Sequence, residues 1–171
     1  MTTLRDPNVS TADETTQVDA LCEAMINELR ELKAICSDRV ADAFRAVPRH
    51  LFAPGKPLEA VYTADSALVT KRDEHGAAVS LVSSAHIQAT MLEQAQLGAG
   101  MRVLEIGTGG CNAALIAELV GEVGKVVSVD IDPGIAGRAR DCLAAADARR
   151  AADAIWRSIA RNVCSWPCSK L

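Results

Sequence analysis

The chain has 171 residues, of which 49% are hydrophobic, and a formal net charge of −4. This length can bury the core of one domain, and 6 prolines and 11 glycines are too few for a disordered protein. The negative charge argues against nucleic acid as the main partner, and the lack of an apolar N-terminal stretch or a long uncharged run predicts no export signal, no membrane span and a cytoplasmic location.

Residues 1–46 are expected to form an N-terminal helical segment. A stripe of apolar residues at helical spacing predicts one long helix with a single packing face, and its members are Val18, Leu21, Cys22, Met25, Ile26, Leu29, Leu32, Ile35 and Cys36. A second, short helix carries Val40, Phe44 and Val47 and should stop at Pro48, whose ring cannot continue a helix.

Residues 67–82 predict a β-hairpin, because two runs of strand-forming residues flank a polar turn at 71–76. The next helix should begin at Ser84. Because Ser83 and Ser84 lie where the strand meets this helix, a helix N-cap is the simplest role for either serine. His86, in the first turn of the helix, is interpreted as a structural histidine rather than a proton carrier.

Residues 101–132 predict a strand, a glycine turn, a helix and a second strand, which together make half of a nucleotide-binding sheet. The first strand carries Glu105 near its end, and the turn 107–110 follows it with three glycines. A valine-rich second strand ends on Asp130 and Asp132, about 20 residues beyond the glycines, as ribose-binding acids require. This order predicts a site for a ribose-containing cofactor.

The composition of the turn favours S-adenosylmethionine over a dinucleotide. Dinucleotide-binding turns read G-x-G-x-x-G and bring a helix N-terminus to a pyrophosphate, whereas this chain has Asn112 in place of the last glycine. Glu105, two residues before the first glycine, would repel a pyrophosphate but attract the amino group and sulfonium of S-adenosylmethionine. A methyltransferase is therefore favoured, and a nicotinamide-dependent oxidoreductase is the disfavoured alternative.

Several short motifs recur across residues 47 to about 146 in the order typical of one enzyme family. They are Val47-Pro48-Arg49-His50-Leu51-Phe52, Tyr62 with Asp65, Leu81-Val82-Ser83-Ser84-Ala85-His86, and Val103-Leu104-Glu105-Ile106-Gly107-Thr108-Gly109 followed by Asn112-Ala113-Ala114. On these motifs the chain resembles the protein-L-isoaspartate O-methyltransferases. The resemblance implies an enzyme that uses S-adenosylmethionine to methylate the stray carboxylate of isoaspartyl residues in damaged proteins.

Two motifs depart from the usual family pattern. The glycine turn is one residue shorter than the usual G-T-G-S-G-Y-N-A-A and has Cys111 where tyrosine is usual. The usual T-I-S-x-P-H is replaced by Leu81-Val82-Ser83-Ser84-Ala85-His86. Both departures resemble the FxLD-type methyltransferases found near lanthipeptide genes. The partner is therefore expected to be either an isoaspartyl-containing protein or a dedicated peptide.

The resemblance implies a role for each candidate site residue. Ser83 is expected to be catalytic, because it matches the family's active-site serine, whose hydroxyl orients the substrate carboxylate; Ser84 is then left as the cap. The expected cofactor-binding residues are Glu105, Gly107, Thr108, Gly109, Gly110 and Asp130. Glu105 would hold the cationic end of the cofactor, the turn backbone would lie beneath its methionine part, and Asp130 would accept hydrogen bonds from its ribose. Asp132 is the second candidate for the ribose and is equally suited to capping the following helix.

The implied chemistry needs little help from an acid or a base. A carboxylate is already ionised near neutral pH, so catalysis should depend on alignment and on the exclusion of water. No metal site is expected, because His50 and His75 lack ligand spacing and Cys164 and Cys168 lack a second pair of thiols.

The predicted fold is α/β: a partial Rossmann-type S-adenosylmethionine-dependent methyltransferase fold with an N-terminal helical and hairpin elaboration. Residues 47–146 should form the isoaspartyl methyltransferase-like region with the first half of the Rossmann sheet, and residues 147–171 an atypical basic tail. Because the family pattern stops at about Ala146, the chain is expected to be truncated at its C-terminus and to have little or no activity alone. An inactive cofactor-binding or interaction module is accordingly the other alternative.

Overall fold

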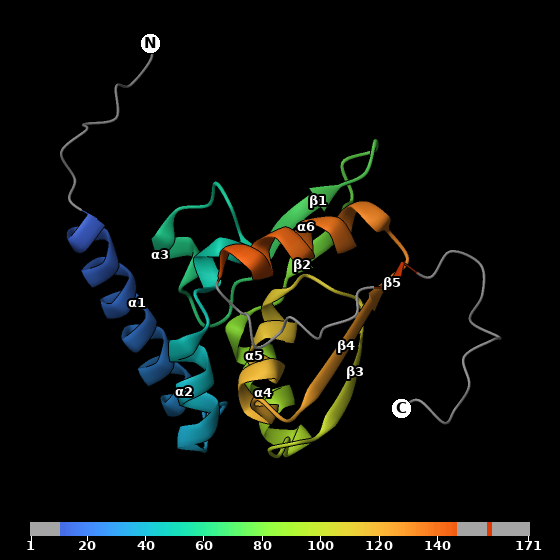
Figure 1. The fold of residues 1–171 in the computed structure, drawn as a ribbon. Coiled ribbons are helices and arrows are strands. Elements are labelled where there is room, and N and C mark those ends of the chain that lie inside the picture. Colours follow the sequence, from blue (N-terminus) through green and yellow to red (C-terminus); the bar gives the residue numbers. More distant parts are fainter. Residues whose placement is uncertain (1–10, 147–156, 159–171) are drawn as a thin grey trace, which may run out of the picture.

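The computed structural model describes residues 11–146 and 157–158, and its fold is α/β (Figure 1). Its elements follow the chain in the order α1 (Thr11–Glu31), α2 (Asp38–Ala46), the 3-10 helix η1 (Arg49–Phe52), α3 (Leu58–Val61), β1 (Leu68–Arg72), β2 (Ala78–Val82), α4 (Ala85–Ala95), β3 (Arg102–Ile106), α5 (Cys111–Val120), β4 (Lys125–Asp130), α6 (Pro133–Ala145) and β5 (Arg157–Ser158). Apart from β5, the predicted basic tail lies outside the described residues. None of the described helices is long and apolar enough to cross a bilayer.

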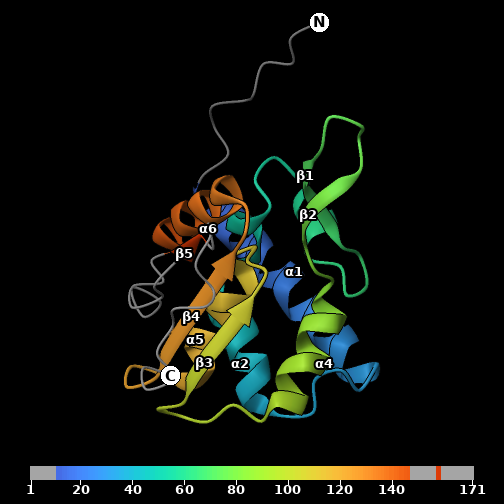
Figure 2. The same cartoon turned by 90° about the vertical axis from the view of Figure 1, so that its right-hand side faces the viewer.

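The predicted strand, turn, helix and strand are confirmed between residues 102 and 130. β3 and β4 pair in parallel, and β5 pairs in parallel with the other edge of β4. α5 connects β3 to β4 and lies behind these strands in Figure 2, with α2 packed against it. The carboxyl ends of β3 and β4 point toward α6 and the β1–β2 hairpin. Ligands bind at this end of the strands in open α/β sheets, so the fold places the candidate residues where the motif requires them.

The first helix ends earlier than its apolar stripe predicts. α1 stops at Glu31, and Lys33 adopts a left-handed conformation with φ of 57°. The amide of Ile35 donates to the Leu29 carbonyl at 3.2 Å, which helps to close the helix end. The prediction of a helix through Cys36 is therefore wrong: the turn carries Ile35 into the core and leaves Cys36 exposed.

The helices enclose one hydrophobic core. Met25 and Leu29 on α1, Phe44 on α2, Phe52 on η1 and Leu115 on α5 belong to the same cluster and are nearly inaccessible to solvent. The N-terminal helices thus share their core with the helix that follows the glycine turn. The division of the chain into segments 1–46, 47–146 and 147–171 stays a prediction.

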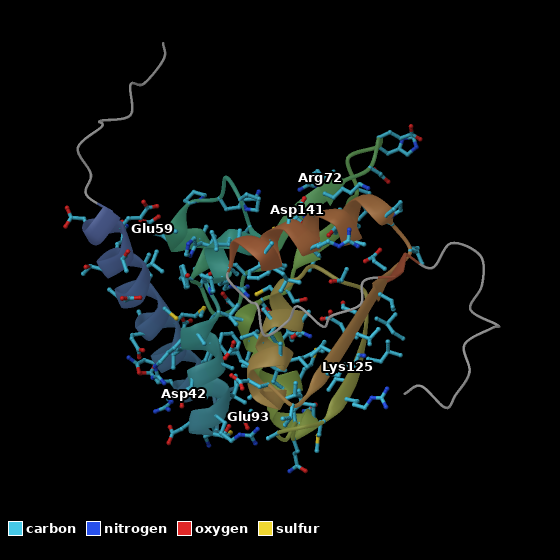
Figure 3. All side chains as sticks on the ribbon, viewed as in Figure 1. Asp42, Glu59, Arg72, Glu93, Lys125 and Asp141 are labelled. Carbon is cyan, nitrogen blue, oxygen red and sulfur yellow. The ribbon has the colours of Figure 1, made fainter. Side chains whose placement is uncertain are left out.

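Glu93 on α4 fixes the start of α2 (Figure 3). Its Oε1 accepts hydrogen bonds from the Cys36 amide at 2.8 Å, the Ser37 amide at 2.7 Å and the Ser37 hydroxyl at 2.9 Å. Ser37 is also the N-cap of α2, because its hydroxyl accepts from the Val40 amide. This carboxylate therefore joins α4 to α2 at the end of the molecule away from the strand tips.

The predicted hairpin is confirmed, with a shorter turn than expected. β1 and β2 pair antiparallel, with an irregular register near Lys71. β1 extends to Arg72, so that the first part of the expected turn belongs to the strand. Asp73 closes the turn, because its Oδ1 accepts from the amides of His75 and Ala77 at 2.9 and 2.8 Å.

Candidate cofactor and substrate site

The glycine turn follows β3 and opens α5. Gly107 and Gly110 have φ of +85° and +87°, in the region that favours glycine. A Cβ built on Gly107 would meet no atom within 4 Å, so the backbone borders open space there. A Cβ on Gly110 would lie 3.0 Å from a ring carbon of Phe52, so this glycine is required for packing against η1. Gly107 thus has room for a ligand beside it, whereas Gly110 is covered.

Glu105 lies near the end of β3 with both carboxylate oxygens in hydrogen bonds. Oε1 accepts from Asn112 Nδ2 at 2.9 Å, and Oε2 accepts from the Ser128 hydroxyl. Burial raises the pKa of Glu105, although these two hydrogen bonds oppose the rise. The Oδ1 of Asn112 is buried and finds no hydrogen-bond partner among the described residues. An amino group placed here would therefore meet a partly buried carboxylate and a free acceptor.

Asp130, at the end of β4, holds the glycine turn. Its Oδ2 accepts from the Thr108 amide at 3.0 Å, and its Oδ1 accepts from the Asp132 amide at 2.8 Å. The Thr108 hydroxyl in turn accepts from the Gly110 amide at 3.2 Å. Each oxygen of a carboxylate has two lone pairs, so Asp130 keeps acceptor capacity for hydroxyl groups.

Asp132 serves as the N-cap of α6. Its Oδ1 accepts from the Gly134 and Ile135 amides at 2.8 and 3.1 Å, and its Oδ2 pairs with Lys71 on the hairpin. The Lys71 ammonium and these amides lower the pKa of Asp132. Of its two predicted roles, the structure shows the helix cap, which leaves Asp130 as the better candidate for a ribose.

Ser83 and Ser84 connect β2 to α4. Ser83 is half-buried, its carbonyl accepts a hydrogen bond from Arg49 Nη2 at 2.6 Å, and its hydroxyl makes none within the part of the chain that the structure describes. Ser84 occupies the N-cap position of α4, as expected, but its side chain makes no capping hydrogen bond. The Ser84 carbonyl accepts from the Gln88 amide at 3.1 Å. Ser83 is therefore not the cap, and its hydroxyl remains available.

Arg49 brings the serine loop and the glycine turn together. Its guanidinium contacts the carbonyl of Ser83 on one side and the Sγ of Cys111, the residue after the turn, at 3.7 Å on another. The sequence placed Arg49 in a family motif but assigned it no role. The turn also lies close to β2, since a Cβ on Gly109 would lie 3.4 Å from the Leu81 carbonyl oxygen.

The hairpin is also fastened to α6. Arg138 on α6 donates to the Thr70 carbonyl at 3.2 Å and to the hydroxyls of Thr70 and Ser80, each at 3.0 Å. Together with the Lys71–Asp132 pair, these contacts hold β1 and β2 beside the strand ends. The loop that carries the candidate serine is therefore supported from two directions.

The histidines have other surroundings. The Nδ1 of His50 lies 2.8 Å from the Tyr62 hydroxyl, and burial lowers the pKa of His50 and raises that of Tyr62 to about 12. His86 donates its amide to the Ala64 carbonyl at 2.7 Å. Within residues 11–146 and 157–158, no group of histidines, cysteines and acids is arranged to hold a metal ion. The cysteine pair near the C-terminus lies outside these residues.

Comparisons with known proteins agree with this arrangement. A family model described as protein-L-isoaspartate(D-aspartate) O-methyltransferase matches residues 20–160. The protein-L-isoaspartate O-methyltransferase of Methanococcoides burtonii is 40% identical over 117 residues, which cover 67% of this chain and 54% of the relative. The enzyme of the same name from Methanoculleus marisnigri is 42% identical over 125 residues, covering 72% and 52%. The chain thus spans about half the length of the curated relatives it matches.

Solved structures show the same fold. A protein-L-isoaspartate O-methyltransferase matches with a TM-score of 0.68 and 33% identity, over 80% of this chain and 41% of the other. A putative protein-L-isoaspartate O-methyltransferase from Plasmodium falciparum, solved in complex with S-adenosyl-L-homocysteine, matches with a TM-score of 0.58 and 14% identity, over 70% and 53%. The α/β methyltransferase fold expected from the sequence is confirmed, and the chain belongs to the protein-L-isoaspartate(D-aspartate) O-methyltransferase family.

Proposed function

We propose that this chain binds S-adenosylmethionine and belongs to an enzyme that methylates the free carboxylate of isoaspartyl residues. The family assignment supports the reaction class. The proposal depends mainly on one observation: the Arg49 guanidinium contacts both the Ser83 carbonyl and Cys111, the residue after the glycine turn. This contact supports a site in which the hydroxyl of Ser83 acts near a turn that has the order of a cofactor-binding motif.

The residues at the strand ends fit this cofactor. Glu105 and the unpartnered Oδ1 of Asn112 would accept hydrogen bonds from its amino group. The backbone of 107–110, including Thr108, would lie beneath its methionine part. Asp130 would accept hydrogen bonds from its ribose hydroxyls. A phosphate near Glu105 would be repelled instead, which argues against a nicotinamide dinucleotide. These roles are proposals that the charge and the open side of Gly107 support.

The chain's contribution to the reaction would be alignment. The cofactor supplies a methyl group bound to a cationic sulfur. A carboxylate oxygen held by the Ser83 hydroxyl would form the new bond to that methyl carbon, while the carbon–sulfur bond breaks and its electron pair stays on sulfur. The products are a methyl ester and S-adenosylhomocysteine, and no proton has to move. Effective placement of two reactants can supply much of such a rate enhancement.

A second candidate function is cofactor binding or interaction without turnover. Leu104 and Ile106 on β3 are 47% and 80% exposed, although parallel sheets are normally covered on both faces. Together with the half-length match to its relatives, this exposure favours an incomplete methyltransferase site in the isolated chain. The main proposal, by contrast, includes three further expectations. The partner is an isoaspartyl protein or a dedicated peptide, the chain belongs to the FxLD-type branch, and its location is cytoplasmic.

Calorimetry with S-adenosylhomocysteine and with NAD tests the cofactor. We expect S-adenosylhomocysteine to bind more tightly, and tighter binding of NAD would overturn the assignment. Transfer of labelled methyl groups to an isoaspartyl peptide, with the aspartyl isomer as control, tests the reaction. Binding without transfer would favour the second candidate function.

Two neighbouring serines provide a matched pair for the substrate side. Ser83→Ala should keep cofactor affinity and lose rate toward the isoaspartyl peptide, because only the predicted substrate contact is removed. Ser84→Ala changes a buried serine in the cap position of the same helix and should leave the rate nearly unchanged. Equal loss of rate in both variants would mean that Ser83 acts through the loop structure and not through a substrate contact.

A further inference from the structure

Arg49 is a buried arginine that forms no ion pair with an acidic residue among residues 11–146. Arg49 is 2% exposed, and each of its hydrogen-bond partners is neutral. Burial of an arginine is costly unless its donors are satisfied, so the position demands an explanation beyond filling space.

The partners of Arg49 belong to segments far apart in the sequence. Nε donates to the Val61 carbonyl on α3 at 2.9 Å, and Nη1 donates to Gln88 Oε1 on α4. Nη1 also lies 3.7 Å from Cys111 Sγ at the start of α5, and Nη2 donates to the Ser83 carbonyl at 2.6 Å. One planar group therefore sets the mutual distances of the serine loop, the first turns of α4 and α5, and α3.

The glycine turn has supports of its own, independent of Arg49. The Gly107 amide donates to the Val129 carbonyl at 2.8 Å, and Asp130 accepts from the Thr108 amide. The Ser83 carbonyl, in contrast, accepts its hydrogen bond from Arg49. Loss of the guanidinium should therefore displace the serine loop more than the turn.

We propose that Arg49 is a positioning residue that fixes Ser83 against the cofactor turn and so sets the alignment of the carboxylate with the methyl group. This inference rests on the proposed function of the site. It assigns Arg49 no contact with either reactant. A planar fork of donors can hold several carbonyls in one orientation, whereas a lysine ammonium carries the same charge on a flexible stem and cannot.

Arg49→Lys tests the proposal, with Arg39→Lys as the matched control. Arg39 also donates to carbonyls, at 2.7 Å to Leu97 and 3.2 Å to Leu119, but it joins the ends of α4 and α5 that lead into the starts of the strands. If the unsubstituted chain shows turnover, Arg49→Lys should lower kcat by roughly 10- to 100-fold, as expected for a misplacement of about 1 Å. Its affinity for S-adenosylhomocysteine should change by less than about threefold, because the turn keeps its own hydrogen bonds. Arg39→Lys should leave kcat unchanged.

Hydrogen–deuterium exchange supplies a readout that does not need turnover. In Arg49→Lys, the amides of segment 83–88, among them His86, should exchange faster, while those of 107–113 stay close to the unsubstituted chain. Arg39→Lys should alter neither segment. A uniform acceleration throughout Arg49→Lys, or no acceleration at 83–88, would overturn the proposal. Local acceleration in a chain that transfers no methyl group would uphold the placement by Arg49 and favour the second candidate function for the isolated chain.

Discussion

Alanine substitutions at Gly107 and Gly110 should have different main consequences, although both glycines lie in the same turn with nearly equal φ, at +85° and +87°. Gly110 should matter mainly for stability and Gly107 mainly for cofactor binding. The difference comes from what a new methyl group meets at each position.

The expected loss at Gly110 has two sources. The backbone at φ +87° and ψ −42° lies in a sparsely populated region for an L-residue, which costs about 1–3 kcal/mol. The added Cβ would also lie 3.0 Å from the Phe52 ring and 3.3 Å from the Ala139 backbone, and overpacking of this kind costs about 1–3 kcal/mol. We therefore expect Gly110→Ala to lower the free energy of unfolding by about 2–6 kcal/mol.

Gly107→Ala should incur only the backbone contribution of about 1–3 kcal/mol, because its Cβ would meet nothing within 4 Å. The same methyl group would occupy the space proposed for the cofactor. Its affinity for S-adenosylhomocysteine should fall by about tenfold or more, equivalent to about 1.4 kcal/mol.

Urea unfolding followed by circular dichroism measures the first effect, and calorimetry measures the second. Gly110→Ala should be the less stable variant, and if it remains folded at low temperature it should lose less cofactor affinity than Gly107→Ala. Equal losses of stability would refute the packing role of Gly110. Unchanged affinity in a folded Gly107→Ala variant would mean that the cofactor does not pass over this glycine.

Three further substitutions test charged groups. Asp130→Ala should weaken S-adenosylhomocysteine binding by about 1–3 kcal/mol in calorimetry, since a buried hydrogen bond to a charged group would be lost; unchanged affinity would exclude it as the ribose acceptor. Because the pKa of Glu105 is raised, cofactor affinity should fall as the pH is lowered through that raised value, and Glu105→Gln should flatten the profile. In the free protein, the free energy of unfolding should fall as the pH rises from the pKa of Glu105 in the unfolded chain to its higher pKa in the folded protein. Glu105→Gln should remove this pH dependence of the unfolding curves. Glu93→Ala should lower the free energy of unfolding by about 1–3 kcal/mol, because the donors of Ser37 and its neighbour lose their acceptor; cofactor affinity should not change, and a loss there would contradict the separation of this contact from the site.

The sequence was sufficient for the elements that have a regular apolar pattern. β3, α5 and β4 could be predicted because short apolar runs alternate with a glycine turn and a helical face. The end of α1 could not, because the apolar stripe continues to Cys36, whereas the helix ends at Glu31 and the chain turns at Lys33, a residue without a local stop signal. There, tertiary packing of Ile35 determines the path, and periodicity cannot report it.

The candidate site divides in the same way. Glu105 and Asp130 could be placed from the sequence because each stands at the end of a strand, and neighbouring parallel strands end at one edge of a sheet. The hydrogen-bond partners of Glu105, Asn112 and Ser128, had no such signal, since each lies within a segment whose apolar pattern already explains it. Arg49 was hidden because a lone arginine in a sequence is normally a surface residue.

The open face of β3 bears directly on the strength of the site. Leu104 and Ile106 flank Glu105 along the strand and are exposed, while Glu105 points to the other face, where Ser128 and Asn112 enclose it. The attraction between this carboxylate and a bound cation depends on how well water is kept from the surrounding protein. A protein segment packed over Leu104 and Ile106 would exclude water from this exposed face of the strand, and the contacts of Glu105 would not change. Cofactor affinity and coverage of this sheet face are therefore linked through the dielectric around one side chain.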